Sequence, residues 1–296
     1  IGLTPSCTEA IIRAGIKRVV IAAIDKNPKH NGNGIQKLRN AGIEVLTGVC
    51  EQEAQKMLAP FFKLQLTGRP YVSLKMAQSF DGGIADHAGN SKWISCEESR
   101  REVRNLRRKS DVVLVGRGTV LADNPSLLRS VEDDGKGLGL PGMRAVLDST
   151  GSLPLTSQIF TDGRASQTIY VTTGLASQER IDAVKAAGAQ VMVLPNAYSA
   201  NEPEKRKISL SVLFEKLGDQ GYMSVLCEGG SELASALINE CLVDELFLFI
   251  APIVLGADSK RVFGAYPFDL PTAPRFEIHD VTRSGGDMLV RAYPKD

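Results

Sequence analysis

The sequence lacks the charge imbalance that would direct it to a nucleic acid or to a membrane. Its 296 residues carry 35 Lys and Arg against 34 Asp and Glu, which leaves a formal net charge of +1. A balance this close to neutral gives no electrostatic footprint for nucleic acid or for an anionic membrane surface. It still permits a local basic pocket for one phosphate. We therefore expect neither nucleic acid nor membrane among the partners.

Cysteine, histidine and long apolar runs are also scarce. The five cysteines are odd in number and include no Cys-x-x-Cys pair, which argues against a disulfide framework and for a reducing cytoplasm. The most apolar run, residues 246–255, is too short to span a bilayer. With only three histidines and no His-x-Glu, His-Glu-x-x-His or Walker A sequence, the chain is predicted to hold no complete metal site.

Residues 1–66 have the pattern of a fragment of an α/β domain. The apolar run 18–24 is typical of a strand buried on both faces, and a second strand is expected at 43–46. Helical patterns cover residues 8–14, 35–41 and 51–66, and the first two end at a glycine. The chain opens on Ile1 without Met, so we expect a chain cut inside a domain. Residues 67–70 form the expected linker.

From residue 71 to residue 296, strand and helix patterns alternate. This alternation predicts an α/β domain whose sheet is mostly parallel, with helices on both faces. The expected strands are 71–77, 112–115, 145–147, 168–172, 190–194, 224–227, 245–250, 276–281 and 288–292, and the expected helices are 97–108, 178–187, 210–217 and 232–240. A hairpin signal at residues 284–287 places antiparallel strands at one edge. Residues 130–142 and 196–206 are polar and are predicted to be flexible.

A glycine pair follows one of these buried strands. The sequence Glu228-Gly229-Gly230-Ser231 stands between the strand 224–227 and the helix that follows. Paired glycines let a backbone approach a phosphate closely, and the first amides of a helix then point at the anion. Ser231 could cap that helix or bond a phosphate oxygen. An ordinary strand-to-helix turn would have the same sequence, so the motif alone leaves both interpretations open.

Polar residues also follow the first strand of this domain. Lys75, Ser79 and Asp81 lie toward its carboxyl end, where open α/β sheets bind ligands, although Asp81 and the glycine after it could form only a turn. Trp93, the one tryptophan, stands in a polar loop. It could lie against a planar cofactor ring or could plug the edge of the domain.

Arginines gather on the helix expected at 97–108. Arg100, Arg104 and Arg107 share one face of it by their spacing. Most such charges form a solvated face, whereas an arginine on the inner face makes a bidentate clamp for phosphate. The segment 116–129 that follows has, by itself, the pattern of a loop.

Together these stretches resemble the family of bifunctional riboflavin-biosynthesis deaminase/reductases. The family's motifs occur in order and with the family's spacing as Lys75-x-x-x-Ser79-x-Asp81-Gly82, Ser91-Lys92-Trp93-Ile94, Arg100-Arg101-x-x-Arg104-x-x-Arg107, Thr119-x-x-x-Asp123-Asn124-Pro125, Leu147-Asp148-Ser149 and Glu228-Gly229-Gly230. Each string is weak alone, but the ordered set is specific. The resemblance covers nearly the whole chain.

The resemblance implies a dihydrofolate-reductase-like reductase domain over residues 71–296. Residues 1–66 would be the end of a cytidine-deaminase-like zinc domain. In this family, NADPH reduces the ribose of 5-amino-6-(5-phosphoribosylamino)uracil to a ribityl chain. A phosphorylated pyrimidine as small-molecule substrate and a homodimer are further expectations from the resemblance.

Roles for single residues are carried over motif by motif. The substrate would be held by Ser91, Arg107, Arg129 and Glu228. NADPH would be held by Ala77, Trp93, Thr119, Asp123, Ser149, Gly230 and Ser231. Lys75, Ser79 and Asp81 would border the reacting carbon, and Lys75 or Asp81 could supply a proton.

The sequence departs from the family pattern in two places. Ser6 replaces the second proline before Cys7, which matches the last of three zinc ligands. The other two ligands and the catalytic Glu lie upstream in the family, and zinc deaminases need all of them. Zinc and deamination are therefore expected only in an uncut protein. The second departure is the segment before Arg129, which is one residue shorter than in the family.

Two other functions remain open at this stage. One is a different NADPH reductase of the dihydrofolate-reductase type, acting on a pterin or another heterocycle. Arg107 and Arg129 argue against it, because an unphosphorylated substrate has less use for two arginines. The other is a catalytically inactive scaffold that binds NADPH, which the fragmentary deaminase part motivates.

Overall fold

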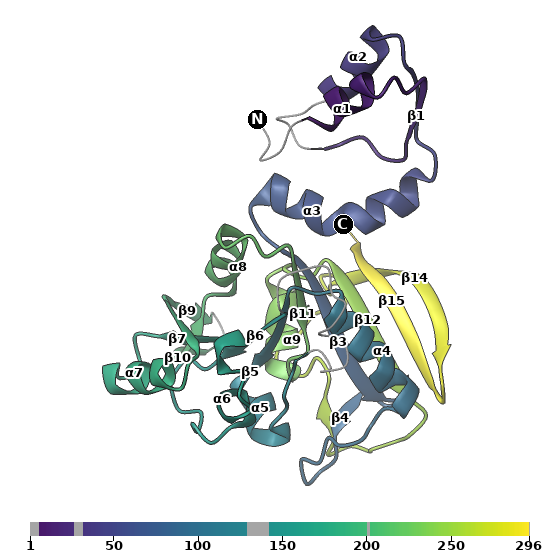
Figure 1. Cartoon of the computed structure of the whole chain (residues 1–296). Helices are drawn as coiled ribbons and strands as arrows, with labels where there is room; N and C mark the ends of the chain where they lie inside the picture. Colours follow the sequence, from purple (N-terminus) through teal and green to yellow (C-terminus); the bar gives the residue numbers. More distant parts are fainter. Residues whose placement is uncertain (1–5, 27–31, 129–141, 200–201, 296) are drawn as a thin grey trace. The chain divides into compact units, whose positions relative to one another are not determined.

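The computed structural model describes residues 6–26, 32–128, 142–199 and 202–295. The chain divides into two compact units, residues 1–69 and residues 70–296 (Figure 1). No helix in the described part of the chain is long and apolar enough to cross a membrane.

The first unit is a small α/β arrangement. Its elements are α1 (Cys7–Arg13), β1 (Arg18–Ile21), α2 (Asn33–Asn40), β2 (Glu44–Thr47) and α3 (Glu51–Thr67). Strands β1 and β2 pair in parallel and form a two-stranded sheet. The expected strand 18–24 is therefore shorter than predicted, and it is not buried on both faces: the Val20 side chain is 54% exposed. The apolar run was a misleading signal because, among the described residues, only β2 pairs with β1.

The second unit is built on a nine-stranded sheet. Its strands, in their order across the sheet, are β14 (Arg275–Ser284), β15 (Asp287–Lys295), β12 (Glu245–Ala251), β3 (Tyr71–Ser79), β11 (Ser224–Cys227), β5 (Val112–Gly116), β6 (Met143–Leu147), β7 (Thr168–Thr173) and β8 (Gln190–Leu194). Strands β12 to β8 are parallel to one another, whereas β15 and β14 run antiparallel at one edge. The mostly parallel sheet and its antiparallel edge are those predicted.

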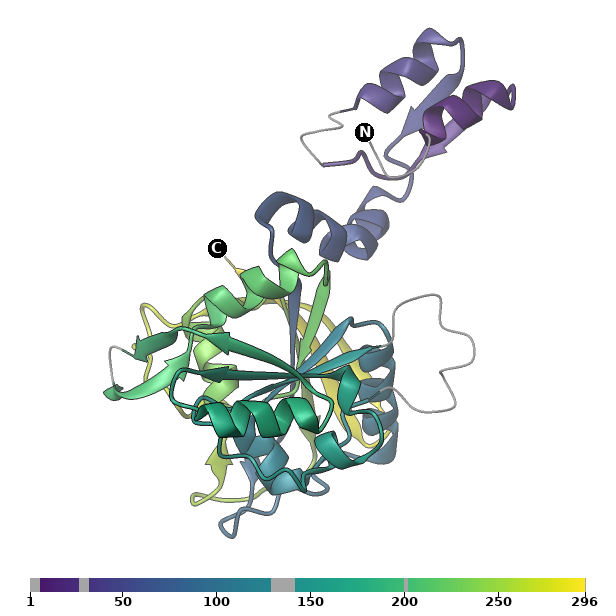
Figure 2. The same cartoon turned by 60° about the vertical axis from the view of Figure 1, so that its left-hand side comes forward.

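Helices cover both faces of this sheet (Figure 1, Figure 2). The helices are α4 (Glu97–Arg108), α5 (Arg117–Asp123), α6 (Gln158–Thr161), α7 (Gln178–Ala186), α8 (Leu210–Asp219) and α9 (Ser231–Asn239), with a short 3-10 helix at Ala165–Gln167. Successive side chains of a strand point to opposite faces. Accordingly, Val225 and Cys227 of β11 pack with α8 and α9, whereas Leu226 between them packs with α4. Residues of β5 facing the same way as Leu226 pack with α5, α6 and α7.

The structure differs from the sequence predictions in the irregular segments. The segment 116–129, which has the pattern of a loop, contains the helix α5, whose Val120 is buried. The stretch 196–206 contains most of a hairpin made of β9 (Asn196–Ser199) and β10 (Glu202–Ile208). The sequence of this stretch is polar and carries no alternating apolar signal from which strands could be predicted. The short strands β4 (Gly83–Ala85) and β13 (Lys260–Arg261) were also missed. Of the stretch 130–142, residues 130–141 lie outside the described residues.

Candidate active site

A cavity of about 1220 Å³ opens at the carboxyl ends of the central strands. Residue pairs Leu74–Cys227 and Cys227–Leu114 are in register across β3, β11 and β5, and Gly116 is in register with Leu147 of β6. Because these strands are parallel, the residues that follow them meet at one edge of the sheet, which is where open α/β sheets bind ligands. All residues lining the cavity belong to the second unit.

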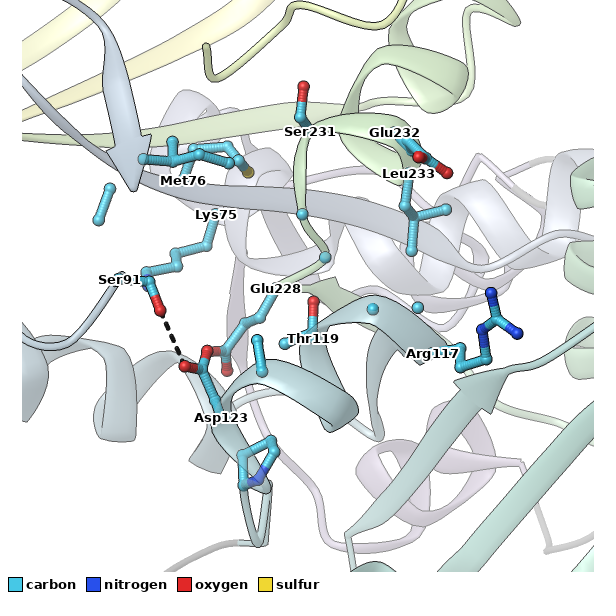
Figure 3. A pocket seen from close by; sticks show the side chains of 18 of the residues that line it. Lys75, Met76, Ser91, Arg117, Thr119, Asp123, Glu228, Ser231, Glu232 and Leu233 are labelled. Carbon is cyan, nitrogen blue, oxygen red and sulfur yellow. Dashed lines mark hydrogen bonds between the residues drawn. The ribbon is translucent and has the colours of Figure 1, made fainter. Parts of the chain in front are cut away.

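Most of the site residues expected from the sequence line this cavity. They are Lys75, Ala77, Ser91, Trp93, Arg107, Thr119, Asp123, Ser149, Glu228, Gly230 and Ser231. Figure 3 shows the side chains of Lys75, Ser91, Asp123 and Glu228 gathered at one end of the cavity. The fold thus brings together residues that are far apart in the sequence, such as Lys75 and Ser231, which are separated by 156 positions.

A charged cluster made of Lys75, Arg107 and Glu228 lies at that end. Arg107 on α4 donates two hydrogen bonds to Glu228, from Nε to Oε1 at 2.5 Å and from Nη2 to Oε2 at 2.9 Å. The pair is largely withdrawn from water, with side-chain exposures of 21% for Arg107 and 8% for Glu228. Bidentate pairing of this kind fixes both side chains in one orientation. It holds the Glu228 carboxylate beside Lys75, which extends from β3.

The surroundings lower the pKa of both Lys75 and Glu228, through different balances of burial and charge. Burial lowers the pKa of the Lys75 ammonium, and the nearby Arg107 lowers it further, against the opposing effects of Glu228 and Asp123. For Glu228, burial raises the pKa, but Arg107 and Lys75 together outweigh burial and leave the pKa below its usual value. At neutral pH, Glu228 is therefore a carboxylate that accepts hydrogen bonds, and the Lys75 ammonium gives up its proton more readily than that of a free lysine.

Asp123 fixes the loop that closes the same end of the cavity. The Ser91 hydroxyl donates to Asp123 Oδ1 at 2.8 Å, and the Lys92 ammonium donates to the Asp123 carbonyl oxygen at 2.8 Å. Trp93, which follows, is 70% exposed at the cavity rim, and the Arg100 guanidinium lies 4.6 Å from its ring centroid. One ring face is thus covered by a cation.

The glycine pair forms the turn between β11 and α9. A side chain at Gly229 would meet the Leu233 side chain at 2.7 Å, so only glycine allows this close packing. Gly230 is the N-cap residue of α9 and has no side chain to cap it. Of the two roles open to Ser231, the structure excludes capping: Ser231 is the first residue within α9, and its hydroxyl accepts a hydrogen bond from the Gly264 amide at 3.1 Å. Its hydroxyl hydrogen remains available to a ligand.

The middle of the cavity lies between α5 and the turn after β6. Thr119 on α5 faces the glycine turn, since its Oγ1 lies 3.8 Å from the position that a Gly230 Cβ would occupy. Ser149 follows the buried Asp148, and the Ser149 carbonyl oxygen accepts from the Thr173 hydroxyl at 2.7 Å. Ala77 of β3 lines the wall beside Lys75 and Met76.

Asp81 and Ser79 do not line the cavity. The Asp81 carboxylate instead accepts hydrogen bonds from the Ser79 hydroxyl at 2.6 Å and from the amides of Leu255 and Gly256 at 3.1 and 2.7 Å. These bonds lower the pKa of Asp81 to about 2, the Ser79 bond having the largest effect. An ionised carboxylate in this position ties the turn after β3 to the loop at 255–256. This geometry disfavours Asp81 as a proton donor.

Two predicted positions cannot be placed in the cavity. Arg129 lies outside the described residues. Cys7 is exposed in the first unit, and the described residues contain no group of three His, Cys, Asp or Glu side chains that could hold a metal ion. A single cysteine does not fit the three protein ligands that a catalytic zinc requires.

The sequence analysis missed several residues that line the cavity. Arg117 lies at the end away from Lys75, on the side of the Leu233 side chain (Figure 3), and Thr150 Oγ1 lies 3.5 Å from Arg117 Nη1. Their sequence surroundings gave little signal, because Arg117 stands in a segment that has the pattern of a loop. The Gly-Arg-Gly sequence at 116–118 directly after a buried strand is the signal that could have found it.

Comparison with known proteins places this geometry in a family. Residues 70–290 match the family model described as the RibD C-terminal domain. The riboflavin biosynthesis protein RibD of Bacillus amyloliquefaciens is 36% identical over 297 residues, which cover 100% of this chain and 76% of that protein.

Solved structures of similar proteins agree with that match. The RibD structure from Acinetobacter baumannii (form 1) has a TM-score of 0.84 and 34% identity, and the match covers 100% of this chain and 78% of that chain. The deaminase/reductase from Thermotoga maritima has a TM-score of 0.79 and 33% identity, with coverages of 100% and 76%. These likenesses confirm the predicted α/β fold. The chain belongs to the family of RibD riboflavin biosynthesis proteins, and residues 70–290 form its C-terminal domain.

Proposed function

We propose that the second unit is a reductase that uses NADPH to reduce the ribose of 5-amino-6-(5-phosphoribosylamino)uracil to its ribityl form. The observation that carries the proposal is Lys75 beside the Arg107–Glu228 pair, at one end of a cavity of about 1220 Å³ that the glycine turn also lines. The Thermotoga maritima relative is described as a 5-amino-6-(5-phosphoribosylamino)uracil reductase, which supports the same substrate here.

The cavity residues fit NADPH in their chemistry. The Gly229–Gly230 turn places the first amides of α9 at the cavity, where they suit a phosphate group. Thr119, Ser149 and Ser231 add hydroxyl groups along the same wall. When bound, NADPH supplies the hydride for the reduction.

The protein's own residues would position the substrate and deliver a proton. Glu228, held as a carboxylate by Arg107, can accept hydrogen bonds from ribose hydroxyls or from the edge of the uracil. Ser91 and Arg107 line the same end and would complete the substrate contacts. Reduction of an imine at the first sugar carbon adds a hydride to carbon and a proton to nitrogen, and the Lys75 ammonium is the donor best placed for that proton.

The first test is NADPH oxidation by the whole chain, with the deaminated phosphoribosylaminouracil as substrate and dihydrofolate as control. We expect oxidation with the pyrimidine and none with dihydrofolate. Oxidation with dihydrofolate alone would move the protein to the second type of reductase. Tight NADPH binding without oxidation of either substrate would instead support an inactive scaffold.

We also propose that residues 1–66 are the end of a zinc deaminase domain and that the protein forms a homodimer. Cys7 would then be one zinc ligand, with the remaining ligands outside residues 1–296. No deamination is expected from residues 1–296, and an ammonia-release assay on the diaminopyrimidine precursor checks this. Light scattering of the purified chain checks the dimer, and a monomeric mass would reject it.

A further inference from the structure

The four arginines that line the cavity within the described residues differ in how their charge is compensated. Arg100 and Arg104 both pair with Glu97, and Arg107 pairs with Glu228. Arg117 is the exception, because no carboxylate of a described residue forms an ion pair with it. The Arg117 guanidinium is therefore the one among the four that still offers its full charge to an anion.

Hydroxyl groups hold the Arg117 guanidinium in place. Arg117 Nη1 donates to the Ser152 hydroxyl and lies 3.5 Å from Thr150 Oγ1. The two hydroxyls lie 3.0 Å apart, and both reach Asp148 Oδ1, at 3.3 Å from Thr150 and 3.5 Å from Ser152. The start of α5 and the turn after β6 thus present a guanidinium and a hydroxyl together at the cavity.

A buried anchor keeps this turn rigid. Asp148 is almost fully buried, and its Oδ2 accepts from the Leu153 amide at 2.7 Å and from the Tyr170 hydroxyl at 2.6 Å. A site whose polar groups are held by buried hydrogen bonds loses little entropy when it binds an anion. The cluster is thereby preorganised although Arg117 itself is exposed.

The cluster lies at the end of the cavity away from Lys75 (Figure 3). Thr119, two residues after Arg117 in α5, lies between the cluster and the glycine turn. Apolar residues that line the cavity include Leu147, Ile208, Leu210 and Leu233, and Leu233 and Glu232 lie on the side of Arg117 (Figure 3). Apolar walls suit a flat base, and the open guanidinium suits a phosphate beside that base.

We propose that Arg117, with Thr150, receives the 2′-phosphate of NADPH and so selects NADPH over NADH. The inference rests on the proposed function, because a dinucleotide whose reacting ring lies beside Lys75 has its adenosine at the opposite end of the cavity. NADPH and NADH differ only in the phosphate on that adenosine. The paired arginines cannot serve it, since each would have to give up a carboxylate partner.

The test is calorimetric titration of the whole chain with adenosine 2′,5′-bisphosphate and with adenosine 5′-monophosphate. These probes differ only in the 2′-phosphate, and they bind without any reaction. We expect the bisphosphate to bind the wild type more tightly than the monophosphate. Arg117→Ala should weaken the bisphosphate by roughly 10- to 100-fold, the loss of a charge-assisted hydrogen bond, and leave the monophosphate nearly unchanged. Arg117→Lys should bind the bisphosphate with intermediate affinity, because lysine keeps the positive charge but lacks the planar guanidinium with its paired N–H donors.

Arg283→Ala is the matched control, since Arg283 is an exposed arginine on β14 that does not line the cavity. The proposal is overturned if Arg117→Ala binds the bisphosphate as the wild type does, or if it loses both probes equally. Equal affinity of the wild type for both probes would overturn it too. Failure of the proposed function is seen separately, as absence of NADPH oxidation with the pyrimidine substrate, whatever the probes show.

Discussion

At the scale of single residues, the site combines an ammonium that loses its proton easily with a carboxylate that keeps its charge. Burial lowers the pKa of the Lys75 ammonium and Arg107 lowers it further, whereas Arg107 and Lys75 outweigh burial at the Glu228 carboxylate. The same two residues in water would titrate close to their ordinary values. The shifted pKa values of Lys75 and Glu228 therefore depend on burial and on the fixed guanidinium of Arg107.

Replacing Lys75 by Met should remove the proton donor while keeping the length of the side chain. We expect the turnover number to fall by about 100-fold or more, the usual contribution of general acid catalysis, with little change in NADPH binding. Because the ammonium form is needed, wild-type activity should decline as the pH rises through the lowered pKa of Lys75, below the 10.5 of a free lysine. Steady-state kinetics against pH measures both effects.

The control for that change is Lys185→Met, at an exposed position on α7. An unchanged turnover number in the Lys75 variant would sink the proton-donor assignment. If the activity of that variant still declined at alkaline pH, the decline would come from the titration of another group.

Replacing Arg107 by Met should destabilise the protein because it leaves the Glu228 carboxylate buried without a partner. Breaking a buried pair in this way costs about 3–5 kcal/mol, here somewhat less because Arg107 is 21% exposed. Urea unfolding of both proteins measures the difference, and the Michaelis constant for the pyrimidine substrate should also rise.

The sign of the pH dependence follows from the lowered pKa of Glu228. The pairing stabilises the fold fully above the unfolded pKa of a glutamate, near 4.5, and the stabilisation is lost as the pH falls through the lower folded pKa. The stability gap between wild type and Arg107→Met should therefore shrink on acidification. A gap that stays constant down to low pH would contradict this account.

At the scale of elements, α4 owes its position to a residue of the distant strand β15. Asp287 is buried, and its carboxylate accepts hydrogen bonds from the Cys96 amide at 2.8 Å and from the Ser99 hydroxyl at 2.6 Å. No side chain of its own caps α4, so Asp287 satisfies the helix start from outside. It thereby fixes the helix that carries Arg107 into the cavity.

Asp287→Ala should cost about 1–3 kcal/mol, because two buried donors lose a charged acceptor. The helix that bears Arg107 would then be held less firmly, so the Michaelis constant for the pyrimidine should rise more than the turnover number falls. Denaturant unfolding and steady-state kinetics measure both effects. Asp280→Ala on exposed β14 serves as control, and equal stability of the two variants would refute the capping role.

At the scale of the whole molecule, the cavity is a property of one unit. All its lining residues lie in the unit of residues 70–296, and the contacts described for Lys75, Arg107, Glu228 and Asp287 also stay within it. A compact unit with its own core is expected to fold without its neighbour.

Residues 70–296 expressed alone should therefore keep the turnover number and the NADPH affinity of the whole chain. The comparison of the two proteins in the NADPH oxidation assay measures this. If the shorter protein is folded by circular dichroism yet inactive, residues 1–69 contribute to the site, and the assignment of the cavity to one unit fails.

The sequence by itself determined the regular framework of the second unit. Parallel strands are rich in apolar residues, and glycines or charged residues mark their ends, so the seven parallel strands of the main sheet could be predicted near their observed bounds. The hairpin signal at residues 284–287 indicated the two antiparallel strands β14 and β15. Most of the site residues that the ordered motifs indicated also line the cavity. Local patterns were sufficient for these strands and helices, because about ten consecutive residues are enough to show an apolar run or a helical period.

The tertiary structure alone decided what several polar residues do. Arg107 meets Glu228 across 121 positions, Asp81 meets the amides near Gly256 across 175, and Asp287 reaches Cys96 across 191. From the sequence, Asp81 and Lys75 were equal candidates for the proton donor. In the structure, Lys75 lies beside the charged Arg107 and Glu228, whereas Asp81 accepts hydrogen bonds from backbone amides. A polar side chain takes its role from whichever partners the fold brings within about 3 Å, and contacts between such distant positions leave no local pattern.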